Sequence, residues 1–133
     1  METTRLTNQE LNDLAGIILD AAITVHRAIG PGLLESVYQE CLVMELRKRA
    51  IKVEREVHVQ LHYQNEPIDK EYKIDLLVEN EIILELKSVE FILKVHEAQI
   101  VSYLRLSNRK LGFLINFNVP LLKQGFKRFV NNF

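Results

Sequence analysis

The chain lacks the features that would place it in several common classes of protein. Its single cysteine, Cys41, rules out an internal disulfide and favours a reducing compartment. No apolar run approaches the roughly 20 residues of a membrane-spanning helix, and residues 1–5 lack the apolar core of a secretory signal. These absences predict a soluble, cytoplasmic protein that does not insert into a membrane.

The chain also lacks a strong charge of either sign. With 17 Lys and Arg against 18 Asp and Glu, the formal net charge is -1, which argues against coating nucleic acid through bulk charge. Local binding remains open, because a cluster of acids adds its own negative charge until a metal binds. A composition of 47% hydrophobic and 26% charged residues, without repeats or linkers, predicts a single domain over residues 1–133.

The hydrophobic pattern predicts two helices, three strands, a helix, a strand and a final helix. Thr7 and Glu10 form a capping box before a long amphipathic helix that Gly30-Pro31-Gly32 ends. We expect further helices over about 33–50, 95–107 and from 120 onward, and strands over 53–63, 72–78, 82–88 and 111–117. Three sequential strands favour a meander, and the intervening helix favours a parallel crossover. The predicted fold is therefore α/β (α+β), with a mixed four-stranded sheet flanked by helices.

Charged residues interrupt two of the predicted strands. Asp75 lies within the apolar strand 72–78, and Glu85 and Lys87 lie within the strand 82–88. Burying an unpaired carboxylate is costly, so such groups are normally paired, metal-bound or neutral. These residues are therefore candidates for a functional site.

The length of the loop between these strands decides whether the two acids can meet, because successive side chains alternate between the faces of a sheet. A loop over residues 79–81 would set Asp75 directly opposite Glu85, and a shorter odd loop with a bulge at Asn80 would leave them diagonal on one face. A two-residue loop would separate them and would require an unfavourable positive φ at Glu81. We expect an odd loop.

On a shared face, Asp75 and Glu85 could hold a hard divalent cation, Mg²⁺ or Mn²⁺, with the backbone carbonyl of Leu86 as a further ligand. Lys87 would then lie near a metal-bound water, where it could lower the pKa of that water or stabilise charge on a phosphate. The alternative is a cross-strand salt bridge of Lys87 with either acid.

Two further pairs have helical spacing. Glu35 and Tyr38 lie at the start of the second predicted helix in the pattern Gly32-x-x-Glu35-x-x-Tyr38, and Gln99 and Tyr103 lie one turn apart on the third. Taken alone, these residues are better explained as a helix-terminal acid, a core tyrosine and a solvated helix face.

Together these motifs resemble the GxxExxY family, a branch of the PD-(D/E)XK nuclease superfamily. The resemblance extends from about Ile18 to Val130. The segments that carry it are Val25-His26-Arg27, Gly30 to Tyr38, Asp75 to Val78, Glu85-Leu86-Lys87, His96 to Gln99 with Tyr103-Leu104, and Gly112 to Phe117.

The resemblance implies a restriction-endonuclease-like core and a role for each matching residue. Asp75 and Glu85 would bind the metal, and Lys87 would be catalytic. Glu35 would be an accessory acid that contacts the metal directly or through water. Gln99 and Tyr103 would line the site and orient the substrate.

We therefore expect a divalent-metal-dependent nuclease, with DNA as the favoured substrate. The alternative is a non-catalytic module that keeps the fold and binds nucleic acid or protein. A homodimer is a further expectation, since small nucleases often need two sites to cut two strands. The candidate contacts to nucleic acid are Tyr38, Arg105, Lys123 and Lys127.

Overall fold

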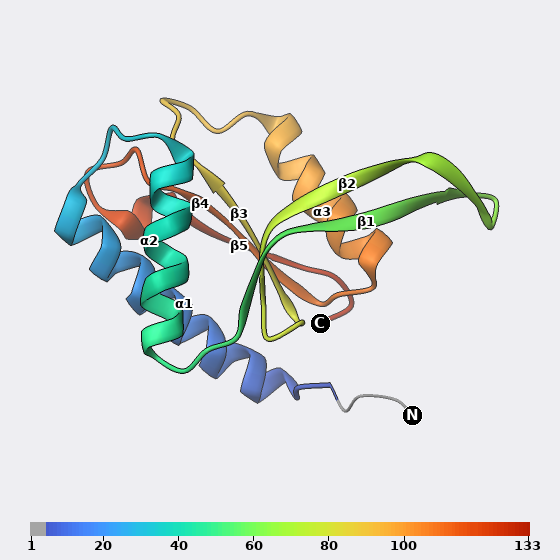
Figure 1. Ribbon diagram of the computed structural model, residues 1–133, viewed down its shortest axis with the longest axis horizontal. Helices are drawn as coiled ribbons and strands as arrows, with labels where there is room; N and C mark the ends of the chain where they lie inside the picture. Colours follow the sequence, from blue (N-terminus) through green and yellow to red (C-terminus); the bar gives the residue numbers. More distant parts are fainter. Residues whose placement is uncertain (1–4) are drawn as a thin grey trace.

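A mixed five-stranded sheet lies at the centre of the computed structural model, which describes residues 5–133 (Figure 1). β1 (Val53–Tyr63), β2 (Glu66–Val78) and β3 (Ile82–Lys87) form an antiparallel meander in the predicted order. β4 (Leu111–Asn116) pairs with β3 in parallel. The prediction that the first residues carry no secretory signal falls mainly on residues 1–4, which lie outside the described part.

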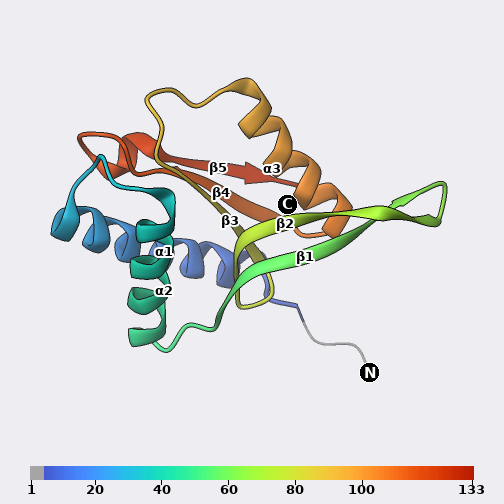
Figure 2. The ribbon, with the colours of Figure 1, turned by 45° about the horizontal axis from the view of Figure 1, so that its top comes forward.

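The helices cover both faces of this sheet (Figure 2). The larger hydrophobic core packs α1 (Asn8–Ile29) and α2 (Glu35–Lys48) against one face, and a smaller core packs α3 (Lys94–Ser107) against the other. Over residues 5–133, no helix has both the length and the apolar character needed to cross a membrane. The predicted α+β class, with a mixed sheet between helices, is confirmed.

The C-terminal segment differs from the sequence-based expectation of a helix after Pro120. The chain forms a short 3-10 helix, η1 (Leu122–Gly125), and then β5 (Phe126–Val130), which pairs antiparallel with β4. β4 is fully buried, so its backbone groups need a hydrogen-bonding partner at that edge, and β5 provides it. The sheet therefore has five strands rather than the four that we expected.

The turn between α1 and α2 depends on two glycines and one tyrosine. Gly30 and Gly32 have φ values of 73° and 91°, which glycine adopts readily. The Tyr38 hydroxyl donates to the carbonyl of Gly30 at 2.6 Å and accepts from the N–H of Leu33 at 3.1 Å. The ring of Tyr38 stacks on Phe117 with a centroid separation of 4.4 Å. These contacts fix the start of α2 relative to the sheet.

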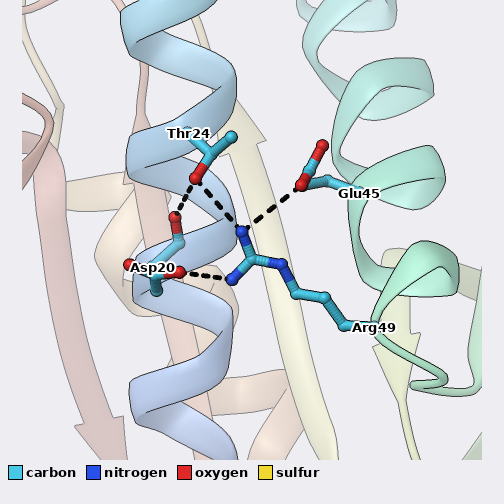
Figure 3. A network of polar contacts seen from close by, with 4 residues as sticks. All are labelled: Asp20, Thr24, Glu45 and Arg49. Atoms are coloured by element: carbon cyan, nitrogen blue, oxygen red, sulfur yellow. Dashed lines mark hydrogen bonds and ion pairs between the residues drawn. The ribbon is translucent and has the colours of Figure 1, made fainter.

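A polar network joins α2 to α1 (Figure 3). Arg49, just after α2, donates to the Asp20 carboxylate at 2.5 Å and to the Thr24 hydroxyl at 3.1 Å, both on α1. The same guanidinium pairs with Glu45 at 3.3 Å. The network at this end and the Tyr38 contacts at the other together set the position of α2, which carries Glu35.

Candidate active site

The loop between β2 and β3 brings Asp75 and Glu85 opposite each other. It comprises residues 79–81, with φ values of 51° at Glu79 and 57° at Asn80. The register pairs Leu76 with Leu84, so one further step sets Asp75 against Glu85. The predicted odd loop is confirmed, in its three-residue form.

Both carboxylates are bonded to the backbone of the neighbouring strand. The N–H of Asp75 donates to Glu85 Oε2 at 2.9 Å, and the N–H of Leu86 donates to Asp75 Oδ2 at 2.9 Å. Gln39 Nε2 on α2 donates to the carbonyl of Asp75 at 3.2 Å. On β1, the strand pairing skips Glu56, which lies between the partners of Leu76 and Ile74 and has a φ of 48°. Side chains thus replace the regular ladder around Asp75.

Burial makes negative charge unfavourable at this pair. Glu85 is only 7% exposed, and its burial, with a further contribution from the Asp75 carboxylate, raises its pKa to about 8. Burial also raises the pKa of Asp75, although the N–H of Leu86 and the ammonium of Lys87 oppose this effect. A buried and a half-buried carboxyl group, both with raised pKa values, offer the oxygen ligands that a hard divalent cation prefers.

The ammonium of Lys87 interacts electrostatically with both carboxyl groups. Lys87 follows Glu85 by two residues on β3, and its ammonium lowers the pKa of both carboxyl groups. Among the described residues, no ion pair within 4.0 Å involves Lys87. The alternative of a cross-strand salt bridge is therefore not formed, and the ammonium stays available to a ligand.

Glu35, the first residue of α2, is exposed, and its charge raises the pKa of both Asp75 and Glu85. In the part of the chain that the structure describes, no three His, Cys, Asp or Glu side chains come together in a way that could hold a metal ion. The predicted role of Glu35 as an accessory acid, in direct contact with a metal or through water, stays a prediction.

α3 brings Tyr103 to the same face of the sheet. Its ring stacks on Tyr72 with a centroid separation of 4.3 Å. Burial raises the pKa of Tyr103, and the carboxyl groups of Glu85 and Asp75 raise it further, so the phenol stays protonated near neutral pH. Gln99, one turn earlier, is exposed and makes no hydrogen bond to a described side chain.

The four residues that we expected to contact nucleic acid have different surroundings in the structure. Tyr38 is fully buried with its hydroxyl bonded to the turn before α2, so we assign it a structural role in place of a nucleic-acid contact. Lys127 is paired with Glu97 at 2.5 Å. Lys123 borders a separate hollow at the end of α1, and Arg105 is exposed on α3.

Two polar residues near the site were missed in the sequence. Gln39 lies four residues after Glu35 on α2, and this spacing could have indicated it. Asn116 is in register with Lys87 and is 4% exposed. Its side chain accepts from the N–H of Val89 at 3.1 Å and donates to the carbonyl of Val89 at 2.9 Å, which fixes the loop after β3. A lone amide in an apolar strand was the available signal.

If Asp75 and Glu85 hold a divalent ion, Gln39→Ala should weaken its binding by about 10-fold, in the range typical of groups that orient ligands. The change leaves the carbonyl of Asp75 without its side-chain partner, so the carboxylate is held less firmly. Gln9→Ala, on an exposed part of α1, is the matched control and should leave metal binding unchanged. The measurement is the Mn²⁺ concentration at the midpoint of the metal-induced rise in Tm. Equal midpoints for Gln39→Ala and the wild type would contradict this positioning role.

A comparison with protein families identifies one that matches the chain. A model of the PD-(D/E)XK nuclease superfamily matches residues 12–129, which is most of the chain. No curated protein matches.

Proposed function

Because the chain belongs to the PD-(D/E)XK nuclease superfamily, we propose that it is a divalent-metal-dependent nuclease that hydrolyses phosphodiester bonds in DNA. We also place it in the GxxExxY branch of that superfamily. The observation that carries the proposal is the carboxylate pair of the buried Glu85 and the half-buried Asp75, which bond to the backbones of β2 and β3.

In this proposal Asp75 and Glu85 hold Mg²⁺ or Mn²⁺, with the carbonyl of Leu86 as a further ligand and Glu35 acting through water. Such an ion, when bound, lowers the pKa of a water molecule and neutralises charge on a phosphate. Lys87 faces the same site and has no protein partner among the described ion pairs. Its ammonium would bind an oxygen of the scissile phosphate and stabilise the negative charge that develops there.

Tyr103 and Gln99 would orient the substrate along α3. The raised pKa of Tyr103 keeps its hydroxyl protonated, so it can donate a hydrogen bond to a phosphate oxygen. Gln99 is exposed one turn away, where its amide can reach a bound strand. Neither residue needs to change its protonation state for this role.

Lys87→Met is the variant that best tests the proposal, because it keeps the length of the side chain and removes its charge. We expect Mg²⁺ or Mn²⁺ to raise the Tm of the wild type and of Lys87→Met alike, since a ligand of the native state stabilises it by mass action. Cleavage of DNA, measured on a plasmid and on a single-stranded oligonucleotide, should fall by at least ~100-fold in Lys87→Met. Lys48→Met, at the exposed end of α2, should cleave like the wild type.

Two results would contradict the proposal. One is a wild-type protein whose Tm neither metal changes and which cuts no DNA with either metal. The other is cleavage by Lys87→Met at the wild-type rate. The first result would favour a non-catalytic module that binds nucleic acid or protein.

A further inference from the structure

The segments that border the candidate site expose large apolar side chains to solvent. Leu34 and Phe91 are 74% and 72% exposed, and Leu93 and Val95 are more than half exposed. These four residues, which we call the apolar rim, lie before α2, in the loop after β3 and in the first turn of α3. Exposed apolar groups that cluster in this way mark binding surfaces.

Two residues of the apolar rim lie close in sequence to residues of the candidate site, and their segments lie at one end of the molecule. Leu34 directly precedes Glu35, whose charge reaches both carboxyl groups. Phe91 lies four residues after Lys87. The turn before α2 and the loop after β3 lie at the same end of the molecule, beyond the end of β3 (Figures 1 and 2).

Hydrogen bonds hold the two segments of the rim together. The Ser88 hydroxyl donates to the carbonyl of Leu33, and Asn116 bonds both backbone groups of Val89. A hollow of about 510 Å³ lies where the segments meet, lined by Gly32, Leu33, Leu34, Val37, Ser88 and Asn118. These hydrogen bonds therefore hold the backbone segments that carry the exposed side chains.

The charges near the apolar rim are of both signs and do not form the continuous basic surface that binds a long duplex. Duplex DNA presents mainly phosphates, which proteins bind through clustered Lys and Arg. Here Lys73 is paired with Glu56 and Lys127 with Glu97. In the segment of the apolar rim, the exposed Glu90 adds a negative charge and the exposed Lys94, the first residue of α3, adds a positive charge. The formal net charge of the chain is -1.

We propose that the substrate of this site is single-stranded nucleic acid, whose unpaired bases stack on Phe91 and pack against Leu34. This inference rests on the proposed nuclease function and adds the class of substrate. Unpaired bases offer apolar faces for stacking on aromatic rings, whereas the bases of a duplex are already stacked on one another. The rim then binds the strand beside the bond that the carboxylate site hydrolyses.

The test compares a single-stranded 20-mer oligodeoxynucleotide with the duplex of the same sequence, in binding and in Mn²⁺-dependent cleavage. We expect the wild type to prefer the single strand in both assays. Phe91→Ala should weaken single-strand binding by about 10-fold, and Phe91→Trp should retain it. The slope of log Kd against log salt concentration should be equal in the wild type and Phe91→Ala, because Phe91 contacts bases and not phosphates.

Tyr63→Ala is the matched control, because Tyr63 is an aromatic residue of similar exposure near the tip of the β1–β2 hairpin. It should bind and cleave like the wild type. An RNA 20-mer of the same sequence shows which sugar the site prefers, and a preference for either single strand over its duplex supports the inference.

Three outcomes would overturn the inference and leave the nuclease proposal in place, provided that metal-dependent cleavage is seen. These are equal cleavage of single strand and duplex, unchanged binding by Phe91→Ala, and conversion of a dimer into a monomer by Phe91→Ala in sedimentation. The last would assign the apolar rim to a contact between two copies of the chain. Failure of metal to stabilise the protein, with no cleavage of any substrate, would instead overturn the nuclease function itself.

Discussion

Glu85→Gln is expected to abolish metal-dependent cleavage and also to stabilise the metal-free protein above neutral pH. Glutamine retains an oxygen that can accept the N–H of Asp75, so the bond between β2 and β3 can persist. It removes the charge that a divalent cation would bind, so cleavage should fall by at least ~100-fold. The metal-induced rise in Tm should disappear as well.

The effect on stability depends on pH in a defined direction. Burial raises the pKa of Glu85 from its usual 4.5 to about 8, so the folded protein binds a proton that the unfolded chain has released between these values. The free energy of unfolding of the metal-free wild type should therefore fall as the pH rises through this window, by roughly 1 kcal/mol per pH unit, and level off above it. Glu85→Gln lacks this proton and should lose that slope.

Urea unfolding in EDTA between pH 5 and pH 9 measures the effect on stability. A separate plasmid cleavage assay, with metal present, measures the effect on cleavage. Glu54→Gln, at an exposed position of β1, is the control and should keep the wild-type pH dependence and the wild-type cleavage rate. Cleavage by Glu85→Gln at the rate of the wild type would contradict the proposed metal site. A pH slope in Glu85→Gln equal to that of the wild type would contradict the burial of an ionisable group at this position.

Of the substitutions proposed here, Gly125→Ala is expected to lower the free energy of unfolding most, by ~3 kcal/mol or more. A Cβ atom at Gly125 would lie 2.0 Å from the carbonyl oxygen of Asn116, so backbone must move. Asn116 also holds Val89 in the loop after Lys87, and its displacement should therefore lower cleavage too. The measurements are urea unfolding and the cleavage rate at a temperature where the variant is folded.

Gly16→Ala is the matched control for this substitution. Gly16 lies within α1, and a Cβ atom at this position would meet no other atom within 4 Å. Alanine should therefore stabilise the protein by up to ~1 kcal/mol through its higher helix propensity. Unfolding of Gly125→Ala at the wild-type urea concentration would show that η1 can shift without cost. That result would contradict the close approach of the two backbones.

The local pattern of the sequence was sufficient to predict most elements and the decisive register. Three polar residues between two apolar strands fixed an odd loop, and alternation then placed Asp75 opposite Glu85. The C-terminal strand was harder, because Phe126 and Phe129 are three residues apart, a spacing that suits one face of a helix. In β5 these two residues contact opposite cores, and the need of β4 for a partner is a long-range effect.

The polar contacts around the site were also beyond the local pattern. Gln39 bonds to a backbone carbonyl 36 positions away, and such a contact imposes no spacing on the sequence. Tyr38 shows the converse case, because a tyrosine near a candidate acid suggested a ligand contact. The Tyr38 hydroxyl instead forms hydrogen bonds with the backbone of the turn before α2.

The bonds between the carboxylates and the strand amides limit how far either acid can swing. Each carboxylate accepts a hydrogen bond from an N–H of the opposite strand. The distance between the two carboxylates therefore follows the spacing of β2 and β3. A rigid frame of this kind would discriminate between cations by size, favouring Mg²⁺ with bonds of about 2.1 Å over Ca²⁺ with bonds of about 2.3–2.6 Å. An oversized ion would push the two strands apart, and β1 would move with β2.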